Sequence, residues 1–161
     1  LVGLALLQDA VLVNAGAVGK GVLTDDGLAA RDMQTAHAAD NARGFQNLAG
    51  HDIRVQTAIE IAARLDRLHG VEPITLLIQG GATGADKHAA RWARLTGIRV
   101  MTYPAAWHLH GKAAGPIRNK RMLDEQRPSL VVAFYGGRGT ADMVNQAKAA
   151  GVAVLDLREV T

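Results

Sequence analysis

Two short glycine-rich segments carry the residues best suited to chemistry in this chain. They are "GGATGAD" (residues 80–86) and "GGRGTAD" (residues 136–142). Each follows an apolar run, holds three glycines and a threonine, and ends in Ala-Asp where a helical pattern begins. Glycine lets a ligand approach the backbone without meeting a Cβ atom, and the first N–H groups of a helix are unpaired at its positive end. The pattern predicts two places where an anion such as phosphate can bind.

Each turn also has a purely structural explanation. One glycine-rich turn alone is most often tight strand-to-helix geometry, and Thr83 with Asp86 fits a capping box. Two matching turns in one sheet favour a ligand site over this alternative. The predicted contact residues in the turns are Gly80, Gly81, Thr83, Gly84, Asp86, Gly136, Gly137, Arg138, Gly139 and Thr140.

The segment between the turns, "WHLHGKAAGPIRNKRM", adds further candidates. If Pro116 opens a helix, Arg118 and Asn119 lie in its first turn. Arginine can hold a phosphate or carboxylate bidentately, and asparagine can read a ribose or base edge. The alternative to a ligand site is a solvated basic helix face. For Lys120 and Arg121, which follow directly, this is the favoured interpretation. Trp107 is a candidate lid or stacking residue, although ordinary packing explains it equally well.

A metal site is not expected in this segment. His108 and His110 lie two residues apart in a predicted loop, with no carboxylate or cysteine partner nearby. Such a pair more often lies at the surface or contacts a ligand than binds a metal.

The hydrophobic pattern predicts the elements that position these residues. Apolar runs predict buried strands at residues 73–81, 98–104, 128–135 and 152–157. Helical spacing and helix signals predict helices at residues 53–70, 83–97, 116–126 and 140–150, with Gly70, Gly97 and Gly151 as C-terminal caps. Residues 105–115 read as a loop. The alternation predicts an α/β domain with a mainly parallel sheet and helices on both faces.

The chain divides into two unequal parts. Residues 51–161 are predicted to form the α/β domain, and residues 1–50 an N-terminal segment in which "DAVLVNAG" can supply one strand. The apolar start is too short to cross a bilayer, is interrupted by Asp9 and lacks a basic flank, so neither a membrane span nor a secretory signal is expected. Without cysteine the chain has no disulfides or thiolate metal sites, which is compatible with the cytoplasm.

Composition limits the function only loosely. A chain of 161 residues with 48% hydrophobic residues is long enough for one domain with a core. The net charge of +3 combines −2 over residues 1–50 with +5 over the rest. A modestly basic domain is compatible with phosphate-bearing ligands or nucleic acid without requiring either.

The motifs together resemble a known family. "GGATGADKHAARWA", "YPAAWHLHGKAAGPIRNKRML" and "LVVAFYGGRGTADMVNQAKAAGV" are similar to the DUF2493 family, the YspA/cpYpsA-related branch of the SLOG superfamily. The likeness runs from about residue 73 to residue 157. It implies a Rossmann-like three-layer sandwich that binds a nucleotide or a nucleotide-derived ligand and requires no other cofactor. Oligomeric relatives also allow a homodimer.

The resemblance implies ligand contacts in both turns and at Arg118 and Asn119. The sequence departs from the family in two places: Tyr135 stands where a proline is usual, and no first strand with a Gly-Arg or Gly-Ser turn is found before Ile53.

Three functions follow from these observations. The first is a nucleotide-binding or sensing module with phosphate on both turns. The second is a phosphoribohydrolase similar to the cytokinin-activating LOG enzymes. Their motif resembles Gly-Gly-x-Gly-Thr-x-x-Glu, and here Met143 stands at the glutamate position, which leaves Asp86 and Asp142 as carboxylate candidates. The third is single-stranded nucleic-acid binding, similar to DprA, along Lys112, Arg118, Lys120 and Arg121. The sequence favours binding over catalysis.

Overall fold

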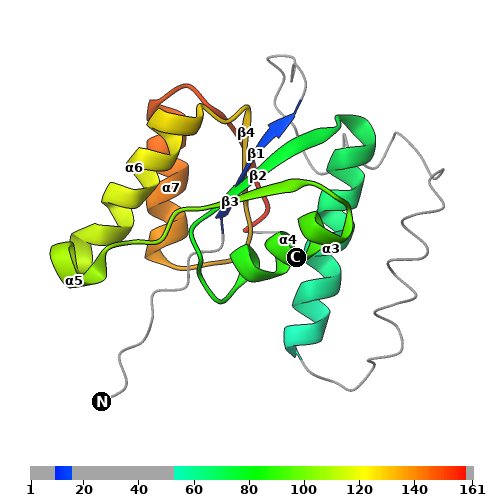
Figure 1. Ribbon diagram of the computed structural model, residues 1–161, viewed down its shortest axis with the longest axis horizontal. Helices are drawn as coiled ribbons and strands as arrows, with labels where there is room; N and C mark the ends of the chain where they lie inside the picture. The colour runs from blue at the N-terminus through cyan, green and yellow to red at the C-terminus, as the bar shows by residue number, and fades with distance from the viewer. Residues whose placement is uncertain (1–9, 16–52, 159–161) are drawn as a thin grey trace.

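A five-stranded sheet lies between two pairs of helices (Figure 1). The computed structural model describes residues 10–15 and 53–158, so the rest of the N-terminal segment lies outside the described residues. The strands are β1 (Ala10–Ala15), β2 (Ile74–Gln79), β3 (Arg99–Thr102), β4 (Leu130–Ala133) and β5 (Ala153–Asp156). The helices are α3 (Ile53–Val71), α4 (Ala85–Leu95), α5 (Trp107–His110), a 3-10 turn η1 (Gly111–Ala113), α6 (Ala114–Gln126) and α7 (Arg138–Ala149).

The strand order is β3-β2-β1-β4-β5, and β1 runs against all the others. β2 pairs with β3 in parallel, as β4 does with β5, while β1 is antiparallel to both of its neighbours. The predicted strand within "DAVLVNAG" is therefore confirmed, but the sheet is mixed rather than uniformly parallel. Either direction satisfies the backbone groups of the neighbouring strands, and antiparallel pairing is slightly more stable per residue.

Side chains at the end of β1 bind it to both neighbours. Thr75 Oγ1 donates a hydrogen bond of 3.1 Å to the Asn14 carbonyl oxygen. The Ser129 N–H lies 3.2 Å from Asn14 Oδ1, and the Ser129 hydroxyl donates to the Val13 carbonyl oxygen at 3.1 Å. β1 thus joins the β2–β3 pair to the β4–β5 pair, although it is distant from both in sequence.

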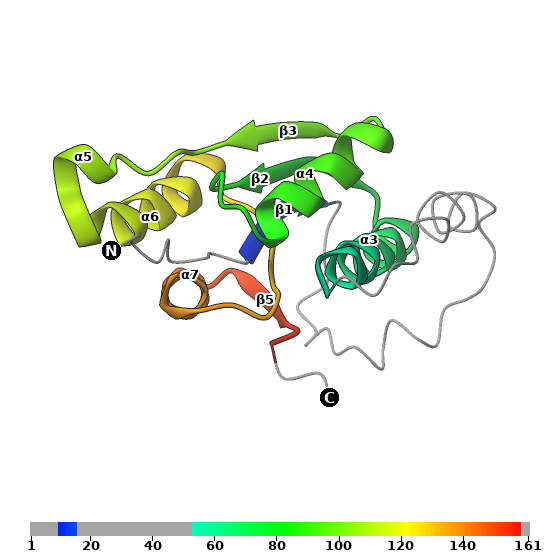
Figure 2. The ribbon, with the colours of Figure 1, turned by 90° about the horizontal axis from the view of Figure 1, so that it is seen from below.

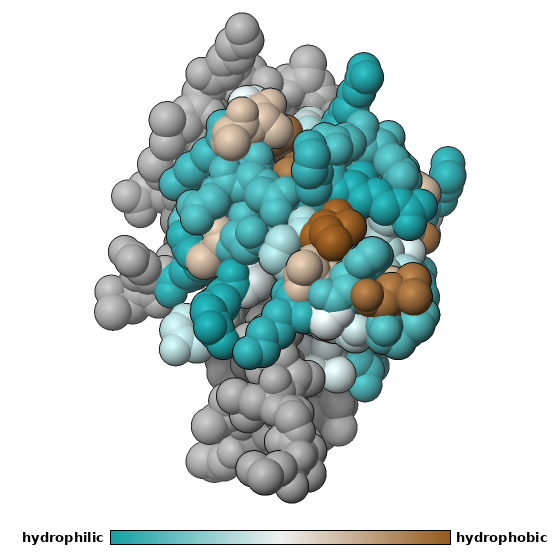
Figure 3. Space-filling view, turned by 90° about the vertical axis from the view of Figure 1, so that its left-hand side faces the viewer, coloured by the Kyte–Doolittle hydropathy of each residue, from teal (hydrophilic) through white to brown (hydrophobic). Residues whose placement is uncertain are grey.

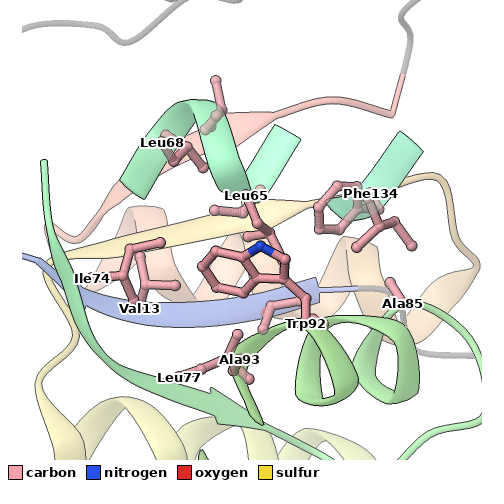
Figure 4. Close-up of a cluster of buried hydrophobic side chains, with 14 of the residues drawn as sticks. Val13, Leu65, Leu68, Ile74, Leu77, Ala85, Trp92, Ala93 and Phe134 are labelled. Carbon is pink, nitrogen blue, oxygen red and sulfur yellow. The ribbon is translucent and has the colours of Figure 1, made fainter. Parts of the chain in front are cut away.

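Helices pack on both faces of the sheet (Figure 2), and each face has its own hydrophobic cluster. α3 and α4 pack on one face, where Val13 and Trp92 belong to the first cluster (Figure 4), as does Val11. α6 and α7 cover the other face, where Leu12, Met122 and Met143 belong to the second cluster. Alternate residues of β1 therefore enter different clusters, as the period of two in a strand requires. The expected three-layer, Rossmann-like arrangement is present in the described residues.

The helix ends confirm two of the three predicted glycine caps. Gly97 and Gly151 have φ values of +78° and +71°, and each follows a helix whose last carbonyls are satisfied by Schellman hydrogen bonds. The prediction for Gly70 is wrong because α3 continues to Val71 and Gly70 has no positive φ. None of the described helices combines the length and the apolar character needed to cross a membrane.

Residues 105–115 contain helical structure where a loop was expected. α5 and η1 occupy most of this segment, and α6 begins at Ala114. Pro116 is consequently the third helical residue rather than the first, and Arg118 and Asn119 lie in the second turn. Proline is tolerated at the third position because the N–H groups of the whole first turn lack intrahelical partners.

Candidate functional site

The two glycine turns lie at the same edge of the sheet. The first follows the carboxyl end of β2 and the second that of β4, and the start of β1 lies between them because Ala10 pairs with Ala133. Since β1 runs in the opposite direction, its carboxyl end lies at the other edge of the sheet. The described part of this edge therefore has a strand-to-helix turn on each side of β1 and none after β1 itself.

The first turn is closed by hydrogen bonds within the protein. Asp86 Oδ2 accepts the N–H groups of Gly80 and Ala82 at 2.9 and 3.1 Å. The Gly81 N–H donates to Gln79 Oε1, and Gln79 Nε2 donates to Thr102 Oγ1 at 2.7 Å. Three successive backbone donors of this turn are thus already engaged.

The predicted capping box in this turn is wrong. α4 begins at Ala85, so Asp86 is its second residue rather than its third, and the N-cap is Gly84 with no side-chain cap hydrogen bond. Thr83 is exposed. Because the helix begins one residue later than a capping box requires, the Asp86 carboxylate is directed back to the turn that precedes it.

Arg118 packs directly against the first turn. Its side chain is 5% exposed, and an alanine Cβ at position 80 would lie 1.5 Å from Arg118 Nη1. Nη1 donates to the Tyr103 carbonyl oxygen at 3.0 Å, and Nε donates to Asn119 Oδ1 at 3.1 Å. Burial lowers the pKa of Arg118, and the negative charge of Asp86 acts in the opposite direction. The absence of a Cβ at Gly80 therefore makes room for a guanidinium group of this protein.

Asn119 connects the same helix to the second turn. Its Nδ2 donates to Asp142 Oδ2 at 2.8 Å and to the Gly139 carbonyl oxygen at 3.3 Å. Gln146 Nε2 also donates to Asp142 Oδ2, at 2.9 Å, and to the Pro116 carbonyl oxygen at 3.1 Å. Arg118 and Asn119 are adjacent in sequence, but Arg118 packs against the first turn and Asn119 binds the second.

The second turn differs from the first despite the matching letters. α7 begins at Arg138, directly after Gly137, so Asp142 is its fifth residue and points to α6 instead of the turn. The first turn of α7 contains no acidic residue, and Gly137 caps it without a side-chain hydrogen bond. The Gly137 carbonyl accepts the N–H groups of Thr140 and Ala141 at 3.1 and 3.2 Å. The N–H groups of Arg138 and Gly139 have no intrahelical partner at this position.

The remaining candidates lie away from the turns or inside the core. Trp107 is half-exposed on α5, where its ring lies near Gly115. Thr140 and Met143 are fully buried in α7. His108 and His110 are exposed, and within the described residues no cluster of three potential metal ligands occurs.

The proposed nucleic-acid path along α6 is not continuous. Arg118 is buried, and the two exposed cations pair within the helix, Lys120 with Asp124 at 3.0 Å and Arg121 with Glu125 at 2.7 Å. The hydrogen bond from Arg121 lowers the pKa of Glu125, so this carboxylate stays charged. The predicted contribution of Arg118 to this path is therefore wrong because its side chain is buried, and Lys120 and Arg121 each pair with a carboxylate on the same helix.

A groove of about 530 Å³ lies between α6 and α7, away from the residues of either turn. Its lining is Pro116, Ile117, Lys120, Gln146, Ala149 and Ala150. Figure 3 views the side of the molecule that carries α5 and α6, where hydrophobic residues lie singly among hydrophilic ones. The groove is mainly apolar, and its one cation is paired with Asp124. It therefore offers no evident site for a phosphate.

Sequence reasoning missed three residues that shape the site: Gln79, Thr102 and Tyr103. Gln79 and Thr102 fix the first turn, and the Tyr103 backbone holds the Arg118 guanidinium. Their positions at the ends of strands could have identified them. Gln79 is the polar last residue of a largely apolar strand, and Thr102 and Tyr103 follow the apolar residues of the neighbouring strand.

Comparisons with known proteins show the family of this chain. The profile of the YspA, cpYpsA-related SLOG family matches residues 48–110. "Gene 61 protein" of Mycobacterium phage D29 is 37% identical over 101 residues, which cover 58% of this chain and 80% of that relative. The chain belongs to the YspA, cpYpsA-related SLOG family. The family profile includes the first turn and α4, whereas the second turn and α7 lie beyond the matched range. No solved structure matches the chain significantly.

Proposed function

We propose that this protein binds a nucleotide or a nucleotide-derived ligand whose phosphate lies at the start of α7. Membership of the SLOG family supports a nucleotide-related role. The observation that carries the proposal is the difference between the two turns. The first has its donors engaged by Asp86 and Gln79, while α7 begins with no acidic residue.

Electrostatics at the two helix starts support the same choice. A carboxylate near a helix N-terminus occupies the place that an anionic ligand would take. Asp86, fully buried as the second residue of α4, already does so there. In α7 the corresponding charge is the exposed cation Arg138, which adds to the positive end of the helix dipole. The start of α7 is therefore a better place for a phosphate than the start of α4, where Asp86 already occupies the helix terminus.

In this proposal Arg118 and Asn119 position the turns. The Arg118 guanidinium balances the charge of Asp86, and Asn119 fixes the Gly139 carbonyl and the Asp142 carboxylate. The ligand then meets a preorganised edge, which lowers the cost of ordering on binding. The residues assigned to direct phosphate contact are Gly136, Gly137, Arg138 and Gly139.

The same geometry favours binding over N-glycosidic hydrolysis. Met143, at the position of the LOG-type glutamate, is fully buried in the second cluster. Asp86 accepts two backbone hydrogen bonds, and Asp142 accepts two from side-chain amides. Both candidate carboxylates therefore serve to hold the turns in this arrangement.

Arg138→Glu is expected to weaken nucleotide binding by about tenfold or more, because a carboxylate replaces a cation where the phosphate binds. Fold stability should be kept, since a carboxylate in the first turn of a helix is favourable. Nucleoside 5′-monophosphates are first screened by thermal shift, and the tightest is then titrated by isothermal titration calorimetry.

Lys87→Glu is the matched control. Lys87 is exposed in the first turn of α4, so the charge change and the local helix position are closely similar. Its affinity is expected to stay within about twofold of the parent. Equal losses in the two variants would support a cradle made of both turns, and the absence of nucleotide binding in the parent would reject the proposed function.

A further inference from the structure

The exposed charged side chains of α4 are all cationic. Lys87, Arg91 and Arg94 are exposed along this helix. Its one acidic residue, Asp86, is fully buried and directed into the first glycine turn. Exposed charge on this described helix is therefore of one sign, unlike on α6, where each of two neighbouring cations has a carboxylate four residues later.

The elements that contact α4 also carry exposed cations. α4 packs against α3 and β3, and each has an exposed arginine, Arg67 on α3 and Arg99 on β3. The pKa of Arg64 is lowered mainly by burial and also by the positive charge of Arg67. The second effect indicates that like charges are crowded here. Of the acidic residues on α3, Asp66 accepts a hydrogen bond from Trp92 Nε1 at 2.7 Å. Glu60 lies seven residues, about 10 Å, before Arg67 along the helix.

We propose that this basic face, defined by Lys87, Arg91, Arg94, Arg67 and Arg99, docks on the phosphate backbone of a nucleic-acid duplex without reading its sequence. Lys87 and Arg94 are seven residues apart, or about 10 Å along the helix. A duplex carries one phosphate per about 3.4 Å of axis on each strand, so α4 spans about three phosphates. This inference goes beyond nucleotide binding at α7 and does not depend on it.

The composition of the face favours a duplex over a single strand. Proteins that bind single strands combine a basic groove with aromatic side chains on which bases stack. Over residues 58–71 of α3 and the whole of α4, the exposed large apolar residues are Val71 and Leu95, neither of them aromatic, and Trp92 is buried in the first cluster. Contacts between cations and the phosphates of a duplex need no base stacking, and exposed lysine and arginine side chains are suited to make them.

The test is the affinity of the full chain for a fluorescently labelled DNA duplex of arbitrary sequence, measured by anisotropy at several salt concentrations. The parent is expected to bind with a log–log salt slope of about −3 to −4. Lys87→Glu with Arg94→Glu should reduce affinity at least tenfold and reduce the size of the slope by about 2. The control is Lys120→Glu with Arg121→Glu on α6, which changes the net charge equally and should keep affinity within about twofold.

Three outcomes would overturn the inference. They are a parent that fails to bind the duplex at low salt, equal losses in the two double variants, and equal or tighter binding of the corresponding single strand. Nucleotide titration of the α4 double variant keeps this result separate from the α7 site. Loss of duplex binding with nucleotide affinity retained assigns the effect to the basic face alone.

Discussion

Replacing Gly80 with alanine should lower the free energy of unfolding by about 3 kcal/mol or more. The new Cβ would lie 1.5 Å from Nη1 and 2.2 Å from Cζ of Arg118, so the guanidinium must leave its buried position. Its hydrogen bond to the Tyr103 carbonyl would break, and the buried charge of Asp86 would lose its balancing cation. Removing one partner of a buried pair costs about 3–5 kcal/mol. Urea unfolding followed by circular dichroism measures the loss.

A double-mutant cycle identifies the cause of this loss. Arg118→Ala alone should also be strongly destabilising, whereas Gly80→Ala added to it should cost little more, because the group that clashes is gone. Gly115→Ala is the control: the added Cβ would lie 3.4 Å from the Trp107 ring, an ordinary contact in a helix. Additive losses for Gly80 and Arg118 would show that the guanidinium does not occupy this place.

Leu12→Ala should lower the free energy of unfolding by about 3 kcal/mol, within the range for buried leucines. Leu12 is fully buried in the central strand, pairs with Ile78 and Val131 and belongs to the cluster beneath α6 and α7. Truncating it leaves a cavity where the two halves of the sheet meet. The same urea measurement applies, with thermal unfolding as a second readout.

Leu95→Ala provides the matched comparison for this leucine. Leu95 is 62% exposed on α4, and its truncation should change stability by no more than about 0.5 kcal/mol. If Leu12→Ala changed the free energy of unfolding as little as Leu95→Ala, β1 would not contribute to the folded domain. The N-terminal segment would then be separate from it.

Periodicity was sufficient to predict the elements that build both turns. β2, α4, β3, β4, α7 and β5 all lie within or close to their predicted ranges. In α4 the alanines and Trp92 at helical spacing are buried, and the lysine and arginine side chains of the helix are exposed. These elements are predictable because local hydrophobic spacing determines which face they bury. The position of both turns at one edge of the sheet also followed from sequence, because parallel strands bring their carboxyl ends to one edge. The contacts of Arg118 and Asn119 with these turns did not.

The rest depended on geometry that the local sequence does not encode. "GGATGAD" and "GGRGTAD" are identical at four of their seven positions, yet α4 begins one residue before its aspartate and α7 four residues before. That offset turns Asp86 towards its own turn and Asp142 towards α6. The direction of β1 was also beyond the pattern, because an apolar strand fits its neighbours in either sense.

The most direct test of the central claim is a nucleotide titration followed by the backbone amide resonances of the protein. Binding at the start of α7 predicts that the amides of Gly136, Gly137, Arg138 and Gly139 shift with the ligand. The amides of Gly80, Gly81 and Ala82 should keep their positions, because Asp86 and Gln79 retain their hydrogen bonds. Shifts confined to Gly80, Gly81 and Ala82, or no shift in either turn at saturating nucleotide, would contradict the account.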